Sequence, residues 1–450
     1  MRRLFGTDGI RGKSNTPPMT AEIALRLGQA VAVVFRKRLD KGKITAVIGK
    51  DTRKSGYIFE YALTSGLCSM GVDVYLVGPM PTPAISHLTK SFAADFGIVI
   101  SASHNPASDN GIKFFDCDGF KLPDDVEEEI ERMLGSAIDT SAVNGTHVGK
   151  AFRIDDAAGR YIEYTKNSIK NMSLSGLKVV LDCANGAAYK VAPPIFRELG
   201  AEVIVLNNRP DGTNINDGCG SMHPEVIKSA VLSNNADIGI ALDGDADRVI
   251  MVDEKGQDVD GDHIIAMCAL DMKRRGKLAK DSVVVTVMTN IGFDIAMRKA
   301  GINVVKAQVG DRYVVEEMKE NSYTLGGEQS GHIIFFSRST TGDGTLSALQ
   351  VLALMKYSGK KLSELAKCMT SYPQVLKNVK VRQKRPIEKM LSVAQAIAKA
   401  EKQLGADGRV LVRYSGTEDK CRVMIEGKDA KEIDALADSI VDKIKAEIGE

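Results

Sequence analysis

The sequence predicts an α/β protein with three consecutive similar α/β domains, whose sheets are mixed and mostly parallel, and a smaller C-terminal α+β domain. Two observations carry this prediction. Short β-branched runs alternate with helical stretches, and the alternation occurs three times along the 450 residues. Residues 371–450 depart from this pattern. The length agrees, because ordinary domains have about 100 to 200 residues.

Each third of the chain contains predicted strands that end in polar, glycine-bearing loops. They are 44–48, 72–77 and 96–100, then 178–181, 202–206 and 238–242, then 283–287, 302–305 and a segment around 323–325. A long amphipathic helix is expected at 21–39, and the C-terminal domain is expected to open on a strand at 379–382 and close on a helix at 431–447. The resulting domains are 1–150, 151–253, 254–370 and 371–450. Polar loops at the carboxyl ends of parallel strands are where such sheets bind ligands.

The charge balance excludes some classes of partner. Sixty Lys and Arg residues stand against 58 Asp and Glu residues, which leaves a net charge of +2. No global field therefore recruits nucleic acid or an anionic membrane, and neither is expected as a partner. A site for a polyanion has to be local.

The cysteines and the N-terminus predict a cytoplasmic protein. The seven cysteines are scattered and include no C-x-x-C pair, so reduced thiols are expected rather than zinc ligands or disulfides. The N-terminus has two arginines but no apolar signal region, and no apolar stretch approaches membrane-spanning length.

Three aspartates, Asp243, Asp245 and Asp247, follow the predicted strand 238–242 at alternate positions. On an extended backbone, residues i, i+2 and i+4 share a face, so the three carboxylates should converge. Anions this close repel one another unless a cation neutralises them, and hard oxygen ligands suit Mg²⁺ or Ca²⁺ rather than zinc. The sequence therefore predicts a Mg²⁺ site.

Two alternatives to this metal site are less consistent with the residues. An EF-hand would place Glu254 at its twelfth position, but Arg248 stands where the turn glycine belongs, and 249–252 has the pattern of a strand. A merely solvated acidic turn would not need the small spacers Gly244 and Ala246 after a buried strand.

A second loop, GGEQSGH at 326–332, has the groups that a sugar requires. Glu328, Ser330 and His332 lie between glycines that let a ligand approach the backbone, and they offer both donors and acceptors to sugar hydroxyls. A glycine-rich turn without a ligand is the alternative interpretation. The G-x-S-x-G nucleophile elbow is absent from the chain.

A third loop follows the predicted strand 409–412 and has the groups of an anion cradle. Arginine guanidinium groups can form paired hydrogen bonds with phosphate oxygens, and hydroxyls and backbone amides around a glycine add further donors. The chain has no Walker A sequence and no G-x-G-x-x-G, so this loop is not a P-loop. A polar hairpin is the alternative interpretation. The residues concerned are Arg413, Ser415, Gly416, Thr417 and Arg422.

The stretch SASHNP at 101–106 follows the predicted strand 96–100 and offers a nucleophile. A hydrolase triad needs a histidine that reaches the serine, and the chain-adjacent His104 is expected to point away from Ser103. A covalent phosphate carrier needs an exposed serine oxygen, a divalent cation and cationic groups, and each has a candidate in this chain. Arg11, in the glycine-rich stretch 5–12, is a candidate phosphate contact, with a tight structural turn as the alternative.

These motifs resemble those of the α-D-phosphohexomutases, and most closely those of the bacterial phosphoglucosamine mutase family. The matching stretches are FGTDGIRG at 5–12, SASHNP at 101–106, DNGIKFF at 109–115, DGDADR at 243–248, GEQSGH at 327–332 and RYSGTEDKCRVMIEG at 413–427. Gln329 stands where the neutral-sugar relatives usually have Met, which favours the amino-sugar branch. The resemblance implies four domains around a central cleft, which contribute in order a phosphoserine loop, a metal loop, a sugar-binding loop and a phosphate-binding loop.

The resemblance also implies a role for each matching residue. Ser103 would be the phosphorylated serine and would share Mg²⁺ with Asp243, Asp245 and Asp247. Lys113 and Arg248 would be catalytic groups beside the phosphoserine and the metal, and Lys113 is the candidate for proton transfer. The substrate would be bound by Arg11, Glu328, Ser330, His332, Arg413, Ser415, Gly416, Thr417 and Arg422.

The implied activity is the interconversion of glucosamine 6-phosphate and glucosamine 1-phosphate through a glucosamine 1,6-bisphosphate intermediate, for UDP-N-acetylglucosamine and cell-wall precursor synthesis. The expected ligands are Mg²⁺, a sugar phosphate and the catalytic bisphosphate, and the chain is expected to be a monomer or homodimer. The alternatives are a phosphomannomutase or phosphoglucomutase of the same superfamily, a Ser-dependent hydrolase or phosphatase, and a non-catalytic sugar-phosphate sensor.

Overall fold

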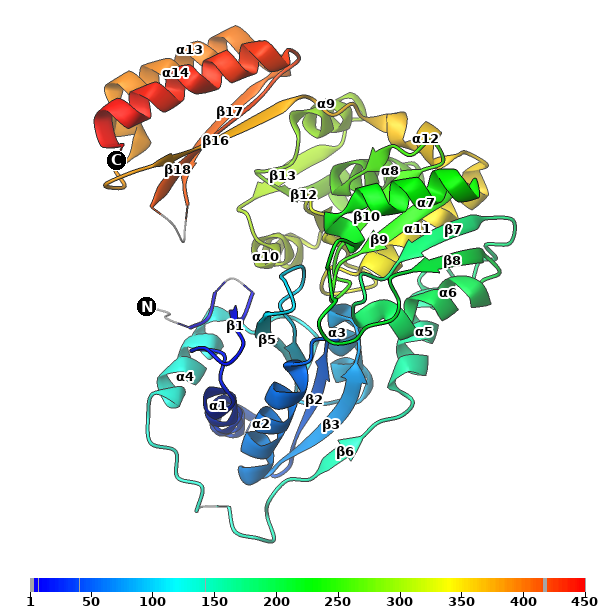
Figure 1. Cartoon of the computed structure of the whole chain (residues 1–450), viewed down its shortest axis with the longest axis vertical. Coiled ribbons are helices and arrows are strands. Elements are labelled where there is room, and N and C mark those ends of the chain that lie inside the picture. The colour runs from blue at the N-terminus through cyan, green and yellow to red at the C-terminus, as the bar shows by residue number, and fades with distance from the viewer. Residues whose placement is uncertain (1–3, 7, 40, 142, 416–418, 450) are drawn as a thin grey trace. The chain divides into compact units, whose positions relative to one another are not determined.

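The computed structural model describes residues 4–6, 8–39, 41–141, 143–415 and 419–449. The chain divides into two compact units, which are described separately (Figure 1). The larger unit comprises Met1–Met288 and Val305–Ala366, and the smaller unit comprises Thr289–Val304 and Lys367–Glu450. None of the helices in the described part combines the length and apolar character needed to span a bilayer.

The first sheet has the strand order β1-β5-β4-β2-β3-β6. Strands β2, β3, β4 and β6 pair in parallel, whereas β5 pairs antiparallel with β1 and β4. All five residues of β4 are buried, as expected for a central strand covered on both faces. The elements are β1 (Ile10–Lys13), α1 (Ala21–Leu39), β2 (Ile44–Lys50), α2 (Gly56–Ser69), β3 (Val72–Pro79), α3 (Thr82–Ser91), β4 (Phe96–Ile100), β5 (Asp109–Asp116), α4 (Asp124–Leu134) and β6 (Ala151–Arg153).

Helix α1 has the bounds that its apolar periodicity predicts, and it packs closely against α2. Leu27, Val31 and Val34 recur at helical spacing and are fully buried. The close approach requires glycine, because a Cβ on Gly66 of α2 would lie 2.1 Å from the carbonyl oxygen of Leu25.

The second sheet has the order β11-β10-β9-β7-β8, with β7 parallel to β8 and β9, and β10 antiparallel to β9 and β11. The carboxyl ends of β7 and β9 therefore meet at one edge, and the aspartate loop begins there. The elements are α5 (Ala157–Asn167), β7 (Lys178–Asp182), α6 (Ala192–Glu198), β8 (Glu202–Leu206), α7 (Pro224–Asn234), β9 (Ile238–Leu242), β10 (Val249–Asp253) and β11 (Asp258–Val259).

The third sheet has the order β13-β12-β14-β15, with β12 parallel to β14 and β14 antiparallel to β15. Two of its strands start later than predicted, at Asn303 rather than 302 and at Leu325 rather than 323. The elements are α8 (Gly261–Arg274), β12 (Ser282–Thr286), α9 (Ile291–Lys299), β13 (Asn303–Ala307), α10 (Asp311–Asn321), β14 (Leu325–Gly327), β15 (Ile333–Phe335), α11 (Gly344–Ser358) and α12 (Leu362–Leu365).

The fourth sheet, in the smaller unit, is antiparallel with the order β16-β18-β17. It comprises β16 (Gln374–Lys380), β17 (Arg409–Tyr414) and β18 (Lys420–Glu426), and it packs with α13 (Leu391–Leu404) and α14 (Ala430–Ile448). The prediction that the first strand spans 379–382 is wrong. Only Val379 of β16 is buried, and Lys377 and Asn378 interrupt its apolar residues, so no apolar run marks where the strand begins.

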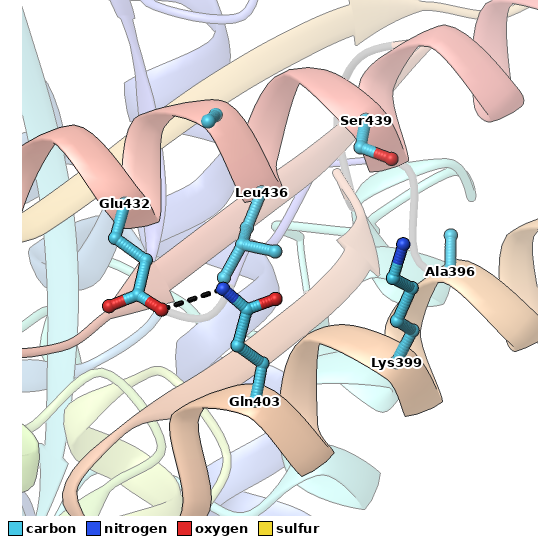
Figure 2. Close-up of a pocket in the computed structure, with 7 residues that line it drawn as sticks. Ala396, Lys399, Gln403, Glu432, Leu436 and Ser439 are labelled. Carbon is cyan, nitrogen blue, oxygen red and sulfur yellow. Dashed lines mark hydrogen bonds between the residues drawn. The ribbon is translucent and has the colours of Figure 1, made fainter.

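Helices α13 and α14 carry a shallow groove of about 320 Å³ (Figure 2). The small side chains of Ala396, Ala435 and Ser439 leave this space. Across it, Gln403 Nε2 donates to Glu432 Oε1 at 2.7 Å and links the two helices.

Asp343, the N-cap of α11, gives the larger unit a pH-dependent stability. Its carboxylate accepts from Leu346 N at 2.8 Å and from the Tyr161 hydroxyl at 2.9 Å, and it is 1% exposed. Burial raises the pKa of Asp343 to about 6. The folded state then holds a proton that the unfolded chain releases near pH 4, so this contribution to stability is complete below about pH 4 and is lost as the pH rises to about 6.

We therefore expect the free energy of unfolding of the native chain, relative to Asp343→Asn, to fall by about 2 kcal/mol between pH 4 and pH 7. Urea unfolding at several pH values measures this difference. Asp429→Asn changes the exposed N-cap of α14 and is the matched control. A difference that is flat with pH would contradict the prediction.

Candidate active site

The serine loop turns sharply at Ser103, three residues after β4 ends at Ile100. Ser103 has a φ of 51°, a left-handed conformation that is uncommon for a residue with a side chain. Ser101 stabilises the turn, because its Oγ accepts from Ser103 N at 2.9 Å and donates to Asp51 Oδ2 at 2.7 Å. The sequence predicts Ser101 as a neighbour of Ser103, and the two hydrogen bonds show what this neighbour does.

The Arg53 side chain stabilises the same loop through hydrogen bonds to its backbone. Its guanidinium donates to the carbonyl oxygens of Ser103 at 2.9 Å, Asn105 at 2.8 Å and Asp109 at 3.1 Å, and also to that of Pro106. Asp51 pairs with Arg53 Nε at 2.7 Å, and both side chains are fully buried. Arg53 thus fixes the backbone that presents Ser103.

The Ser103 hydroxyl points at the aspartate loop. Ser103 Oγ donates to Asp243 Oδ2 at 2.6 Å across 140 residues of sequence. The approach is so close that a Cβ on Gly244 would lie 2.6 Å from Ser103 O, which explains the small spacer. Ser103 is only 1% exposed, whereas the sequence argument expects an exposed oxygen; the hydroxyl is turned inward to the carboxylate.

The three aspartates converge as predicted, but for a different reason. One oxygen from each of Asp243, Asp245 and Asp247 lies within 4.8 Å of the others, and all three residues are buried. The backbone between them is a turn and not an extended strand, since Ala246 N donates to Asp243 O at 3.0 Å and Ala246 has a φ of 57°. The expectation of a shared strand face is therefore wrong.

The buried carboxylates repel one another, as expected for a site that binds a cation. Burial, followed by the charges of Asp247 and Asp245, raises the pKa of Asp243 well above its ordinary value. Burial and the charge of Asp245 likewise raise the pKa of Asp247. Asp245 Oδ1 and Asp247 Oδ1 have no hydrogen-bond partner among the described residues. Buried anionic oxygens of this kind fit a divalent ion with oxygen ligands.

Asp245 differs from its neighbours because it has a buried cationic partner. Lys113 Nζ lies 3.0 Å from Asp245 Oδ2, and the Thr82 hydroxyl donates to the same oxygen at 2.6 Å. Burial opposes the charged form of Asp245, but Lys113 and Thr82 outweigh it and lower the pKa of Asp245. Lys113 also lies 3.1 Å from Asp8 Oδ2. Burial lowers the pKa of Lys113, but Asp245, Asp8 and Asp247 raise it further, so its amine stays protonated.

An ion-pair chain leads from Lys113 to the sugar loop. Asp8 pairs with Lys113, Arg11 and Lys121, and Lys121 pairs with Asp311. Asp311 Oδ2 lies 3.4 Å from His332 Nε2. The structure thus brings predicted residues Arg11, Lys113 and His332 together through Asp8, Lys121 and Asp311, which the sequence analysis missed. Asp8 lies within the quoted FGTDGIRG stretch, but no local pattern marks Lys121 or Asp311.

Arg248 joins the metal loop to His104 and to the sugar loop. Its guanidinium lies 3.1 Å from His104 Nδ1, and its backbone forms a β-bridge with His332. His104 Nδ1 is also 3.5 Å from Ser103 Oγ, so the expectation that His104 points away is wrong; the left-handed turn keeps the ring near the serine. Burial, then Arg248 and Arg11, lower the pKa of His104 to about 4, so the ring is neutral and accepts from Arg248.

The sugar loop links β14 and β15 and carries several polar side chains. Glu328 Oε1 accepts from Gly310 N at 3.3 Å, and Ser330 Oγ lies 3.4 Å from Glu328 Oε2. His332 Nε2 lies 3.2 Å from Gly342 N and 3.4 Å from Asp311 Oδ2, and His332 Nδ1 has no hydrogen-bond partner among the described residues. Gln329 Nε2 donates to Asp260 Oδ2 at 3.2 Å.

In the smaller unit, Arg413 of β17 lies directly opposite Arg422 of β18. Burial and the charge of Arg422 lower the pKa of Arg413. The buried Ser415 donates through its N–H to Lys420 O at 2.8 Å, and Lys384 Nζ donates to Ser415 O at 3.0 Å. This tip of the sheet is strongly cationic, as a phosphate site requires. Gly416 and Thr417, which the sequence also predicts here, lie outside the described residues.

A change at Arg53 should reveal its positioning role. Arg53→Lys keeps the positive charge but replaces the planar guanidinium and its several N–H donors with a single ammonium group. Most of the hydrogen bonds to the carbonyl oxygens of the serine loop are therefore lost. We expect kcat to fall about 10-fold to 100-fold with little change in KM, and the free energy of unfolding to fall by about 3 kcal/mol. Steady-state kinetics and urea unfolding measure both. Arg26→Lys is the control, because Arg26 also donates to carbonyl oxygens, those of Leu134 and Ser136, on an exposed surface.

Four domain models of the phosphoglucomutase/phosphomannomutase family match the chain in order. They are the alpha/beta/alpha domains I, II and III at residues 2–139, 159–256 and 260–372, and the C-terminal domain at 376–443. A phosphoglucosamine mutase of Pelobacter propionicus is 59% identical, and the match covers 100% of both chains. One of Syntrophotalea carbinolica is 58% identical over 100% of this chain and 98% of the relative. The chain belongs to the phosphoglucosamine mutase family.

Solved structures show the same fold across the superfamily. A phosphoglucomutase/phosphomannomutase family protein of Burkholderia thailandensis has a TM-score of 0.80 at 24% identity, with 99% of each chain covered. The N-acetylphosphoglucosamine mutase of Aspergillus fumigatus, solved with GlcNAc-6P and magnesium, has a TM-score of 0.68 at 18% identity and covers 99% of this chain and 96% of that one. The predicted four-domain α/β architecture with a small C-terminal domain is thereby confirmed for this family member.

Proposed function

We propose that the chain interconverts glucosamine 6-phosphate and glucosamine 1-phosphate, with Ser103 as the phosphate carrier. The observation that carries this proposal is the 2.6 Å hydrogen bond from Ser103 Oγ to Asp243, within a buried cluster of three aspartates of which the other two, Asp245 and Asp247, pair with Lys113. A serine placed beside a cation site is the arrangement that phosphoryl transfer requires. The relatives named phosphoglucosamine mutase support the amino sugar as the substrate.

Mg²⁺ fits the aspartate cluster. Asp243, Asp245 and Asp247 would hold it, together with an oxygen of phosphorylated Ser103. Asp245 Oδ1 and Asp247 Oδ1 have no hydrogen-bond partner among the described residues, so they remain available as ligands. When bound, the ion offsets the negative charge of the transferring phosphoryl group.

The first transfer breaks the bond between Ser103 Oγ and phosphorus and forms a bond between phosphorus and O1 of glucosamine 6-phosphate. The proton of that hydroxyl ends on Ser103 Oγ, and the product is glucosamine 1,6-bisphosphate. The hydroxyl of the unloaded serine then donates to Asp243, as it does in the structure. The second transfer reverses these bonds with the 6-phosphate and leaves glucosamine 1-phosphate.

The cationic side chains bind and orient rather than accept protons. Lys113 is held as an ammonium by Asp245, Asp8 and Asp247, which suits a donor to phosphate oxygens and not a general base. Arg248 and Arg11 add charge beside the phosphoserine. Glu328, Ser330 and His332 Nδ1 would bind sugar hydroxyls or phosphate oxygens.

The phosphate at the other end of the sugar would be held by Arg413, Ser415, Gly416, Thr417 and Arg422. The opposed arginines Arg413 and Arg422 support this assignment. Because both ends of the bisphosphate carry a phosphate, one cradle can serve both orientations of the intermediate. We further propose that the enzyme acts in the cytoplasm as a monomer or homodimer and supplies amino-sugar precursors for the cell wall.

Substrate preference tests the proposed reaction. We expect kcat/KM for glucosamine 6-phosphate to exceed the values for glucose 6-phosphate and mannose 6-phosphate by at least about 10-fold, because a site built around polar groups discriminates when one of its partners is missing. Coupled assays with purified protein measure the three values. A preference for either neutral sugar would favour the phosphoglucomutase or phosphomannomutase alternative, and binding without turnover would favour a sensor.

A further inference from the structure

The larger unit contains a second cavity, of about 600 Å³, that includes none of the residues assigned to catalysis. Five segments line it: the turn at 168–172 after α5, the C-terminal half of α8 with the residues that follow it, Thr324 just before β14, the end of β15 with 337–338, and the last turns of α11. Its volume lies in the range of sites that bind small molecules, about 300–1,000 Å³.

Positive charge is concentrated on the lining of this cavity. Lys170, Arg275, Lys277 and Arg338 stand against one acidic side chain, Asp271. Asp271 is already engaged, because Arg274 donates to it at 2.8 Å and Arg275 at 3.3 Å. The charge of Arg275, then burial and the charges of Lys170 and Arg338, lower the pKa of Lys277, which shows that the four cations lie close enough to repel.

The rest of the lining is largely apolar. Phe335 and Leu354 are buried, and Met172 and Met272 add flexible apolar surface. The Tyr357 ring, 39% exposed, stands beside the cations, with the Arg275 guanidinium 5.2 Å from its centre. A ligand complementary to these lining residues has a multiply charged anionic group at one end and a flat or apolar group at the other.

Two elements run from this cavity to the sugar loop. Strand β15 follows His332 directly and ends at Phe335 in the cavity wall. Helix α8 begins where Gly261 N donates to Gln329 O at 3.0 Å, and its C-terminal half carries Met272 of the cavity wall. The cavity and the sugar loop therefore share β15 and α8.

We propose that this cavity is a second binding site, separate from the catalytic one, for a nucleoside diphosphate or a ligand of that class. The diphosphate would be bound by Lys170, Arg275, Lys277 and Arg338, and the nucleoside would pack on Tyr357 and the apolar wall.

Calorimetric titration of ADP and UDP into the full-length chain tests this site, with inorganic diphosphate as a third titrant. We expect at least one of the nucleotides to bind the native chain and inorganic diphosphate to bind at least about 10-fold more weakly, because it lacks the apolar part. Arg275→Gln and Lys277→Gln should each raise the dissociation constant at least about 10-fold. Both side chains are exposed, so these variants should fold, and urea unfolding checks that they do.

Lys273→Gln is the matched control. It removes a positive charge from the last turn of α8, directly before Arg275 and Lys277 in the chain, but Lys273 does not line the cavity, and binding should be unchanged. Saturating glucosamine 6-phosphate should not displace the nucleotide. The proposal is overturned if neither nucleotide binds, if binding survives in both cavity variants, or if glucosamine 6-phosphate displaces the nucleotide, which would place it in the catalytic phosphate site. Inorganic diphosphate that binds as tightly as the nucleotides would overturn the nucleoside assignment. All readouts are binding constants and do not depend on mutase turnover.

Discussion

Ser103→Ala is expected to lower mutase activity by at least about 10⁴-fold, because no other group could replace a covalent phosphate carrier. The fold should survive, since the change removes one hydroxyl whose partner, Asp243, keeps its contact with Arg248 N at 3.2 Å. Activity is measured in a coupled assay, and intact-mass spectrometry measures the phosphate that the native chain carries and the variant lacks.

Ser101→Ala is the matched control for this change. It removes the neighbouring hydroxyl that orients Ser103 but leaves the carrier in place, so we expect a loss of about 10-fold. A Ser103→Ala variant with native activity, or a phosphate found on another residue of the native chain, would contradict the assignment of the carrier.

Removal of the divalent cation should have a comparably large effect. A chelator is expected to abolish activity and added Mg²⁺ to restore it, and Asp245→Asn should lower kcat by about 10³-fold or more because it removes one proposed ligand of the ion. Asp253→Asn is the control, since the carboxylate of Asp253, a buried aspartate of the same domain, accepts from the loop amides of Lys255 and Gln257, each at 2.9 Å.

Asp243→Asn should raise the stability of the metal-free protein although it lowers the mutase activity. In the metal-free chain, burial and the neighbouring aspartates raise the pKa of Asp243, so its charged form weakens folding as the pH rises above the ordinary carboxyl value. We expect the substitution to raise the free energy of unfolding of the metal-free protein at pH 7 by about 1–2 kcal/mol and to eliminate the stabilisation by Mg²⁺. A metal-free variant that is less stable than the native chain would show that the carboxylates are not under repulsion.

Local sequence patterns predicted most of the fold. The period of apolar residues in α1 and the β-branched runs of β2, β4 and β9 are strong signals, because burial on one stripe or on both faces dictates side-chain type. The start of β16 was missed, because Lys377 and Asn378 interrupt its apolar residues and no apolar run forms.

The catalytic loops were also predicted, but their geometry was not. The aspartates converge through a turn with Ala246 in the left-handed region, and His104 stays near Ser103 for a similar reason. Backbone conformations of this kind depend on the contacts that hold them, such as the bonds from Arg53 to the serine loop.

The family and the order of the domains could be read from residue types at fixed short spacings, and the same motifs predict which residues react. The positions of charges relative to one another could be seen only in the folded chain. Asp8, Lys121 and Asp311 are far apart in the chain and belong to no shared motif, yet they form the ion-pair chain between Lys113 and His332. The cations around the second cavity likewise come from three separate segments, which contribute Lys170, Arg275 with Lys277, and Arg338. Electrostatic coupling depends on distance in space, and only the packing of distant segments sets that distance.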